Sequence, residues 1–216
     1  MIEAASLSDR VFDHLEDGIF SGKYPPGEIL TELRLSRELE VSRTPVREAL
    51  RRLQQEGLIR ETGKGSQVLG LSARDVSDIY DIRLRTEGLA ARWAARRISP
   101  EQRTALEEVV ELQNFYLSRG DTDKLKSTDT EFHTLLYAAC GSPVLQGILT
   151  GLHRKIQGFR RRSLSQTGRA KEALAEHQAI LKALAAGDEE EAERLAVLHV
   201  SRARDNILKQ EELSWD

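Results

Sequence analysis

The chain has 216 residues, of which 39% are apolar and 31% charged, and its formal net charge is −3. This length and composition are typical of a folded, helix-rich protein of two domains and exclude a disordered chain. Cys140 is the single cysteine, which excludes an intrachain disulfide and a thiolate zinc cluster, and no apolar run approaches the ~20 residues that span a bilayer, so we expect a cytoplasmic protein.

Residues 1–70 contain three helical patterns separated by turn signals. Apolar residues at helical spacing predict a first helix over 7–20: Leu7, Val11, Leu15 and Ile19. The two prolines and the glycine of residues 24–27 then interrupt the pattern. Thr31 is a suitable N-cap for a short second helix, and Ser42 is one for a third helix that has Pro45 in its first turn and ends at Gly57.

The third helix carries two kinds of side chain on opposite faces. The apolar face predicted to be buried consists of Val46, Ala49, Leu50 and Leu53, followed by Leu58. The outward face carries Arg43, Thr44, Arg47 and Arg51. Between Ser42 and Lys64 six bases stand against three acids, so positive charge is concentrated here although the whole chain is acidic. A basic helix face of this kind suits phosphates and base edges, whereas scattered arginines elsewhere usually mean a solvated surface.

Two short segments after this helix predict a β-hairpin. Residues 58–61 and 66–69 flank the tip Thr62-Gly63-Lys64-Gly65, in which the glycines suit a tight turn. Three helices followed by a hairpin make a winged helix-turn-helix over residues 1–70.

The rest of the chain is predicted to be helical throughout. After a linker at 71–73, breaks at glycine and proline divide residues 74–216 into six helices: 74–97, 100–119, 122–140, 143–163, 169–186 and 189–212. We therefore expect a mainly α protein, in which the winged helix-turn-helix precedes an all-α six-helix antiparallel bundle.

Three of these helices direct histidine or aspartate toward the interior of the bundle. Asp129 and His133 share the apolar stripe of one helix, and His177 and His199 lie in the stripes of two others. A buried carboxylate is costly unless something binds it. One carboxylate and three imidazoles suit Zn²⁺, Ni²⁺, Mn²⁺ or Fe²⁺, so these four residues predict a divalent metal site.

Other polar residues are interpreted as structural. His153 lies near an apolar stripe and is expected to be a core histidine, and His14 is expected on the surface. The run of arginines at 160–162 is most simply a solvated face, although one member could reach an anionic ligand. Arg83 forms either an ordinary i,i+4 pair with Glu87 or a clamp for a carboxylate ligand.

The segments at 24–27, 41–50 and 56–59 together resemble the GntR family of bacterial transcription regulators. The second domain resembles the ligand-binding FCD domain of the FadR subfamily, and a count of six helices rather than seven points to its VanR-like branch. The resemblance implies that the third helix enters the major groove of DNA and that the hairpin tip reaches the minor groove. The residues implied to contact DNA are Ser42, Arg43, Thr44, Arg47, Gly63 and Lys64.

Two positions depart from the family pattern. Leu33 stands where many members have an arginine, which leaves a DNA contact from the second helix in doubt. Glu40 replaces a common glycine, which suggests a slightly different turn.

The resemblance also implies a function for the second domain. Asp129, His133, His177 and His199 match the family's metal ligands, and Arg83 matches an arginine that faces the effector pocket. We expect a DNA-binding homodimer and a repressor, in which a small carboxylate at the metal site controls affinity for a palindromic operator in double-stranded DNA. The alternatives are a regulator that responds to metal alone and a metal-dependent enzyme fused to a DNA-binding domain. The second is disfavoured because no further acid or base stands beside the ligands.

Overall fold

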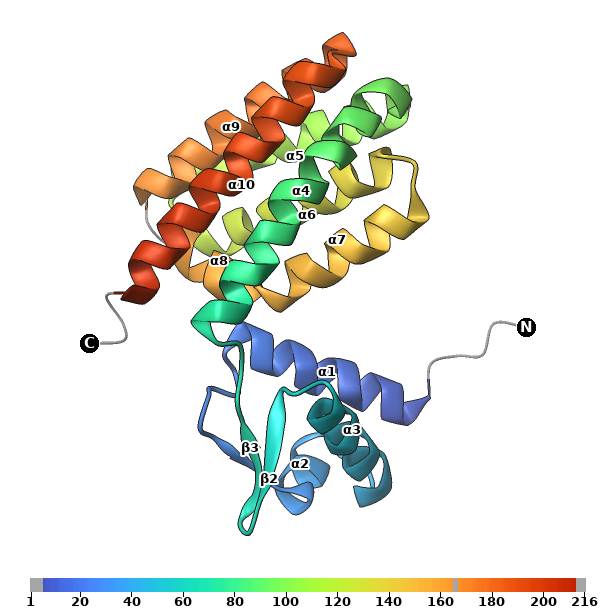
Figure 1. Ribbon diagram of the computed structural model, residues 1–216, viewed down its shortest axis with the longest axis vertical. Coiled ribbons are helices and arrows are strands. Elements are labelled where there is room, and N and C mark those ends of the chain that lie inside the picture. Colours follow the sequence, from blue (N-terminus) through green and yellow to red (C-terminus); the bar gives the residue numbers. More distant parts are fainter. Residues whose placement is uncertain (1–5, 165–166, 213–216) are drawn as a thin grey trace. The chain divides into compact units, whose positions relative to one another are not determined.

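The computed structural model describes residues 6–164 and 167–212 (Figure 1). The chain divides into two compact units, Met1–Ser72 and Ala73–Asp216, each with its own hydrophobic core. Within the described ranges, the search for membrane spans finds no helix with the length and apolar character that crossing a bilayer requires.

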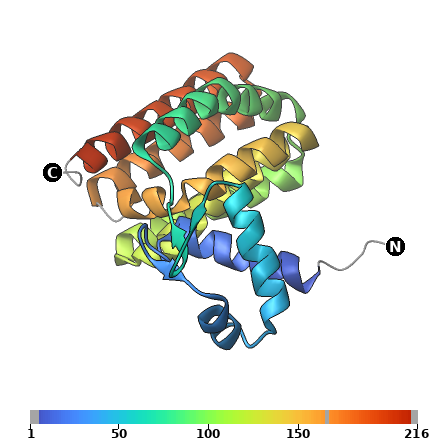
Figure 2. The same cartoon turned by 60° about the horizontal axis from the view of Figure 1, so that its bottom comes forward.

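The first unit is a winged helix-turn-helix. Its elements are α1 (Leu7–Ser21), β1 (Ile29–Leu30), α2 (Glu32–Glu38), α3 (Arg43–Gln55), β2 (Ile59–Thr62) and β3 (Gly65–Val68). The hairpin predicted from the sequence is confirmed as β2 and β3, and the small sheet is seen from below in Figure 2. The sheet has a third strand that the sequence did not reveal, because β1 is too short to show any alternation, and the antiparallel order is β1-β3-β2.

Capping explains where the helices of this unit begin. The Ser6 hydroxyl accepts a hydrogen bond from the Asp9 amide, and the Asp9 carboxylate in turn accepts one from the Ser6 amide. Thr31 caps α2 as predicted, by accepting from the Arg34 amide. Ser42 occupies the N-cap position of α3, but its side chain makes no capping hydrogen bond. The Ser42 hydroxyl is therefore exposed at the start of the helix.

The turn between α2 and α3 contains a residue in the left-handed region. Glu40 has a φ of 54°, which glycine adopts at no steric cost and other residues rarely adopt. Glu40 therefore adopts a backbone conformation that glycine would favour. The glutamate at this position, in place of the family's common glycine, strains the backbone of the turn.

The second unit contains seven helices among its described residues. They are α4 (Ala73–Arg97), α5 (Pro100–Arg119), α6 (Thr122–Ala139), α7 (Pro143–Lys155), α8 (Gln157–Leu164), α9 (Thr167–Ala186) and α10 (Glu189–Glu212). α4 packs along α10, and α5 packs along α6 and α9 (Figure 1). The all-helical architecture is as predicted, but the count of six is wrong, and the argument for the VanR-like branch from that count does not hold.

The extra helix arises because the predicted helix over 143–163 breaks in two. Ile156, with φ −98° and ψ 12°, leaves the helical region between α7 and α8, and Gly158 just beyond it has a weak helix propensity. The apolar stripe continues across this residue, and Ile156 is fully buried. Periodicity alone therefore cannot reveal the break, which allows α8 to leave the direction of α7.

Candidate DNA-binding face and candidate metal centre

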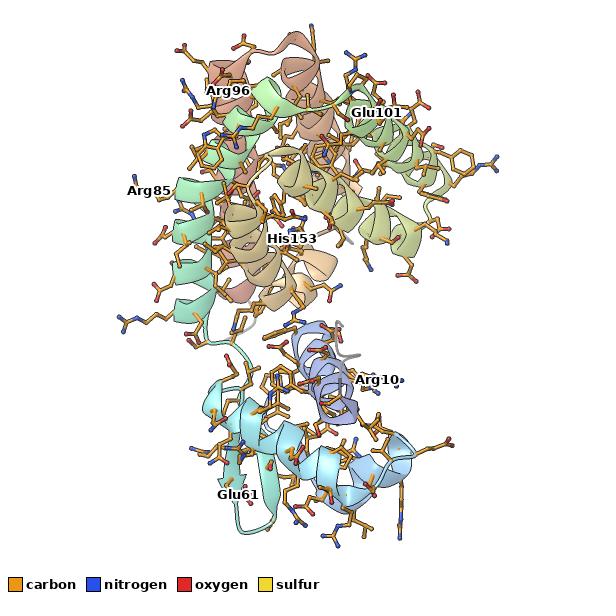
Figure 3. The ribbon with its side chains drawn as sticks, turned by 90° about the vertical axis from the view of Figure 1, so that its right-hand side faces the viewer. Arg10, Glu61, Arg85, Arg96, Glu101 and His153 are labelled. Atoms are coloured by element: carbon orange, nitrogen blue, oxygen red, sulfur yellow. The ribbon has the colours of Figure 1, made fainter. Side chains whose placement is uncertain are left out.

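The outward face of α3 carries the polar residues that the sequence singled out. Arg43, Thr44 and Arg47 are exposed, whereas Val46, Ala49, Leu50 and Leu53 are buried beneath them. This division follows from the helical period, which places the two sets on opposite sides. Gly63 and Lys64 form the exposed tip between β2 and β3, and the neighbouring Glu61 is labelled in Figure 3.

One carboxylate from α2 binds both exposed arginines of this face. Glu32 accepts hydrogen bonds from Arg47 at 2.7 and 2.9 Å and from Arg43 at 3.0 and 3.2 Å. The hydrogen bonds from Arg47, followed by those from Arg43, lower the pKa of Glu32 to about 2. The arginines nevertheless keep 60% and 65% of their side-chain surface exposed, so the guanidinium groups are positioned and remain open to a ligand.

These residues line a groove of about 520 Å³ that is built from α2, α3 and the hairpin. Its cationic side chains are Arg43, Arg47, Arg51 and Lys64. Leu33 also lines this groove and is 51% exposed. Arg34, next to it, is bound instead by Glu28 at 2.6 Å. No arginine of α2 lines this groove.

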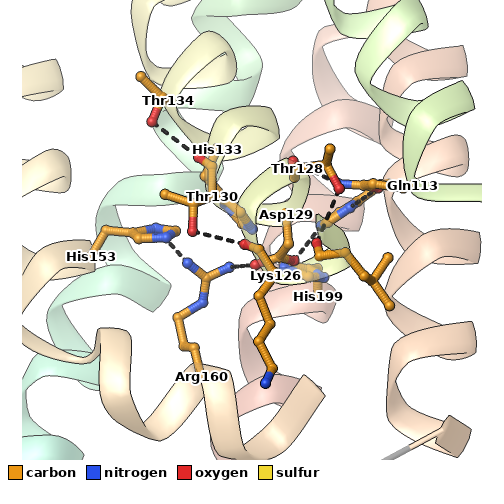
Figure 4. A network of polar contacts seen from close by, with 12 residues as sticks. Gln113, Lys126, Thr128, Asp129, Thr130, His133, Thr134, His153, Arg160 and His199 are labelled. Atoms are coloured by element: carbon orange, nitrogen blue, oxygen red, sulfur yellow. Dashed lines mark hydrogen bonds and ion pairs between the residues drawn. The ribbon is translucent and has the colours of Figure 1, made fainter. Parts of the chain in front are cut away.

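In the second unit, three helices bring histidines together in the interior. His133 of α6, His177 of α9 and His199 of α10 each offer a ring nitrogen, and these atoms lie within 4.8 Å of one another. All three side chains are buried. Figure 4 shows two of them in the surrounding network of polar contacts. The structure thus places the three predicted histidines in one cluster.

The hydrogen bonds around His177 and His199 determine which ring nitrogen remains available. Gln113 donates its amide to the carbonyl of Thr128, so its oxygen accepts from Nδ1 of His177 at 2.9 Å. Nδ1 of His199 donates to the Glu176 carboxylate at 2.7 Å. In both rings Nδ1 is the donor, so a metal would bind through Nε2.

The charge state of the cluster also suits metal binding. Burial, followed by the nearby charge of Arg160, lowers the pKa of His133 well below its ordinary range. Burial, followed by His199 and Arg160, does the same for the pKa of His177. Among the described residues, Nε2 of His133 and Nε2 of His177 have no hydrogen-bond partner. Neutral rings with unused Nε2 atoms fit a divalent cation, because metal ligands must be deprotonated.

Asp129, the fourth predicted ligand, lies beside this cluster but is already engaged. One carboxylate oxygen is 3.9 Å from Nε2 of His177, and the other accepts a hydrogen bond from Arg160 at 2.5 Å. Asp129 therefore lies at the edge of the three-histidine group and is held there by the guanidinium of Arg160. The ligand atoms that lie within 4.8 Å of one another belong to the three histidines and do not include Asp129.

Arg160 corrects the sequence-based interpretation, whereas His153 is buried as expected of a core histidine. Arg160 is only 8% exposed, so it is not part of a solvated face; the side chains of Arg161 and Arg162 lie outside those described. Arg160 donates to Nδ1 of His153 at 2.9 Å (Figure 4). Because a guanidinium can only donate, His153 carries its proton on Nε2, opposite to the tautomer of His177 and His199. His153 is therefore a donor beside the cluster and is unsuited to be a ligand.

Arg83 is fully buried and forms the i,i+4 pair with Glu87, whereas its role as a clamp for a carboxylate stays a prediction. Its Nε donates to Glu87 at 2.5 Å, and the guanidinium lies over the ring of Tyr80. Its Nη1 and Nη2 atoms, like Nε2 of His153, have no partner among the described residues. Buried donors without acceptors are rare in folded proteins and indicate a missing acceptor.

The space at this centre is small. A cavity of about 20 Å³ is lined by Tyr80, Asp129, Arg160, Arg169 and His199, among others. This volume admits an ion or one water molecule but no organic acid. The lining side chains come from α4, α6, α8, α9 and α10.

Several residues of the centre were not predicted from the sequence. Gln113 of α5 and Arg160 of α8 bind His177 and Asp129. Glu176 of α9 binds His199 and is itself bound by Arg169. Hydrogen bonds from His199 and Arg169 lower the pKa of Glu176 to about 2, although burial alone would raise it. The only sequence signal for these residues was a polar side chain within an apolar stripe, which surface residues also produce by chance.

Comparisons with known proteins agree with both halves of this structure. The family model described as bacterial regulatory proteins, gntR family, matches residues 7–68, and the FCD domain model matches residues 78–202. The HTH-type transcriptional regulator YdhC of Bacillus subtilis is 30% identical over 192 residues, which cover 88% of this chain and 86% of that protein. The gluconate operon transcriptional repressor of Bacillus licheniformis is 31% identical over 180 residues, or 83% and 73% of the two chains.

Among solved structures, E. coli McbR/YncC superimposes with a TM-score of 0.81 over 97% of this chain and 100% of that one. The two sequences are 23% identical, so this similarity shows the fold alone.

Proposed function

The chain belongs to the GntR family of transcription regulators and carries an FCD domain, and from this premise we propose that it is a repressor controlled by a small carboxylate bound at a metal site. The observation that carries the proposal is the buried group of three histidines, two of which have Nε2 atoms without a partner among the described residues. Glu87 links His133 to Arg83, whose Nη atoms are also unpaired there. Such an arrangement offers one pole for a cation and another for an anion.

For the DNA-binding half, the exposed α3 arginines and the basic wing tip support the proposal. Arg43 and Arg47 are the proposed base or phosphate contacts from α3, together with Ser42 and Thr44. Gly63 and Lys64 are the proposed contacts from the wing. Arginine pairs bidentately with guanine in the major groove, and a positioned guanidinium loses less entropy on binding.

In the helical unit, His133, His177 and His199 would hold a divalent cation, with Asp129 completing the set after rotation. Zn²⁺, Ni²⁺, Mn²⁺ and Fe²⁺ all accept such ligands, and the cation would supply a positive pole for a carboxylate. Arg83 would bind an acceptor of the same molecule through its two unpaired nitrogens. We propose His153 as a neutral donor next to Arg83, because its Nε2 proton lacks an acceptor.

The relative from B. licheniformis is named as a repressor of an operon, and this supports the sign of regulation proposed here. We propose a homodimer that reads a palindromic operator, since two copies related by a twofold axis present two identical α3 helices. The carboxylate would favour one arrangement of the two DNA-binding units over another.

One observation favours a second candidate function, that of a regulator which responds to the metal alone. The cavity of about 20 Å³ beside His199 has room for an ion or one water molecule, whereas a carboxylate needs a larger space. In that case the metal, in the absence of any organic acid, would change operator affinity.

The test is a thermal-shift screen of small carboxylates against the full-length chain, with and without a chelator, followed by operator binding. A ligand that binds the folded state raises the melting temperature. We expect a carboxylate whose stabilising effect disappears on chelation and which weakens operator binding. Stabilisation that survives chelation would reject the metal-dependent site, and a change in operator affinity with metal alone would favour the second candidate.

A further inference from the structure

Leu33 is an apolar side chain exposed on an otherwise polar surface. It lies in the first turn of α2, is 51% exposed, and lines the same groove as Arg43, Arg47 and Arg51. Among the described residues of this unit, the other exposed large apolar side chains are Leu7 and Leu69, and neither lines the groove. Leu33 is thus placed where a ligand of the arginines would meet it.

The polar neighbours of Leu33 on α2 already have partners. Glu32 binds Arg43 and Arg47, and Arg34 binds Glu28 at 2.6 Å and lies 3.9 Å from Glu38. The start of α2 therefore presents a hydrocarbon side chain to the groove, flanked by the two arginines that Glu32 holds. A base contact from the Leu33 side chain can be apolar but cannot be a hydrogen bond.

The chemistry of duplex DNA supplies one matching group. Base edges in the major groove carry donors and acceptors, and the C5 methyl group of thymine is the apolar exception. We propose that Leu33 contacts a thymine methyl group in each half-site and thereby selects thymine at that position. This inference rests on the proposed function of the α3 face, because it requires the groove to lie against DNA.

Replacement of thymine by uracil in the operator removes only the methyl group and so tests the contact directly. An operator is first selected in vitro from random duplex DNA with the full-length chain. Thymines are then replaced by deoxyuridine in symmetric pairs, one pair at a time. Burial of one methyl group is worth about fourfold in affinity, so we expect one pair to weaken binding by about fifteenfold when both half-sites lose it.

The variants of Leu33 assign that loss to the side chain. Leu33→Ala should bind the thymine and uracil operators equally, whereas Leu33→Met should retain most of the discrimination. Leu7→Ala, a replacement of a leucine that is 46% exposed on α1 and does not line the groove, is the matched control and should discriminate as the wild type does. The salt dependence of binding should not change in Leu33→Ala, because no phosphate contact is lost.

The outcomes separate this inference from the proposed function. If no uracil pair weakens wild-type binding, or if Leu33→Ala discriminates as well as the wild type, the methyl contact is refuted while DNA binding through α3 stands. If Arg47→Ala and Leu33→Ala both bind the selected operator as the wild type does, the proposed contact of the α3 face with DNA is refuted, and the inference about Leu33 fails with it.

Discussion

Removal of two of the three clustered histidines should abolish metal binding without removing the rest of the centre. The perturbation is the double variant His177→Ala, His199→Ala, because Gln113 and Glu176 engage Nδ1 of these residues and so direct metal binding to Nε2. With two of three imidazoles gone, His133 and Asp129 alone make a weak site. The matched control is His153→Gln, which keeps all three histidines of the cluster.

The size of the effect follows from binding linkage. When free metal exceeds the dissociation constant a thousandfold, the folded state gains about 4 kcal/mol. For a unit of this size each kcal/mol raises the melting temperature by 2–4 °C, so the metal should raise it by roughly 8–16 °C. The two substitutions also disturb packing, because both side chains are buried. The quantity to compare is therefore the rise on adding metal, and not the melting temperature of the apoprotein.

The assay combines thermal unfolding in buffered Zn²⁺ with elemental analysis of the dialysed protein. We expect the wild type and His153→Gln to bind metal and to be stabilised, and the double variant to do neither. Undiminished metal content in the double variant would refute the site. Loss of metal in His153→Gln, with the fold intact by circular dichroism, would refute the tautomer argument.

Three further predictions concern the DNA-binding unit. Arg47→Ala should weaken operator binding by ~1–3 kcal/mol if Arg47 contacts a base, and unchanged affinity in a gel-shift titration at fixed salt would remove it from the interface. Glu40→Gly should raise the free energy of unfolding by about 1 kcal/mol, because glycine adopts the positive φ of 54° without strain. Glu40→Ala retains the strain and is the control. If denaturant unfolding shows an equal gain in Glu40→Ala, removal of the charge and not of the strain is the cause. Arg47 and Arg43 lower the pKa of Glu32 from 4.5 to about 2, so its ion pairs should stabilise the fold above pH 4.5 and lose that effect as the pH falls from 4.5 toward 2. The difference in melting temperature between the wild type and Glu32→Gln should therefore shrink over that interval. A difference that does not depend on pH would contradict the assignment of the stabilisation to these ion pairs.

Local patterns were sufficient to predict most of the fold. The helical stripes, the cap at Thr31 and the glycine after α3 each act within a few residues of the chain, and all are found where the sequence placed them. β1 and the break at Ile156 were missed for the opposite reason. A two-residue strand exists only because β3 lies beside it, and the apolar stripe continues unchanged across the break.

For the candidate sites, the sequence by itself determined which face of a helix most residues occupy, because helical periodicity depends on neighbours in the chain; buried Arg160 is the exception. It was sufficient to single out His133, His177 and His199, and Arg43 and Arg47. Only the tertiary structure decided what these residues contact. The proton positions on His177 and His153 depend on Gln113 and Arg160, which come from other helices. Likewise, the pairing of Glu32 with the two arginines requires α2 to lie against α3. Hydrogen bonds and charges act through space between distant segments, so the chemistry of both sites is set by packing that no local pattern records.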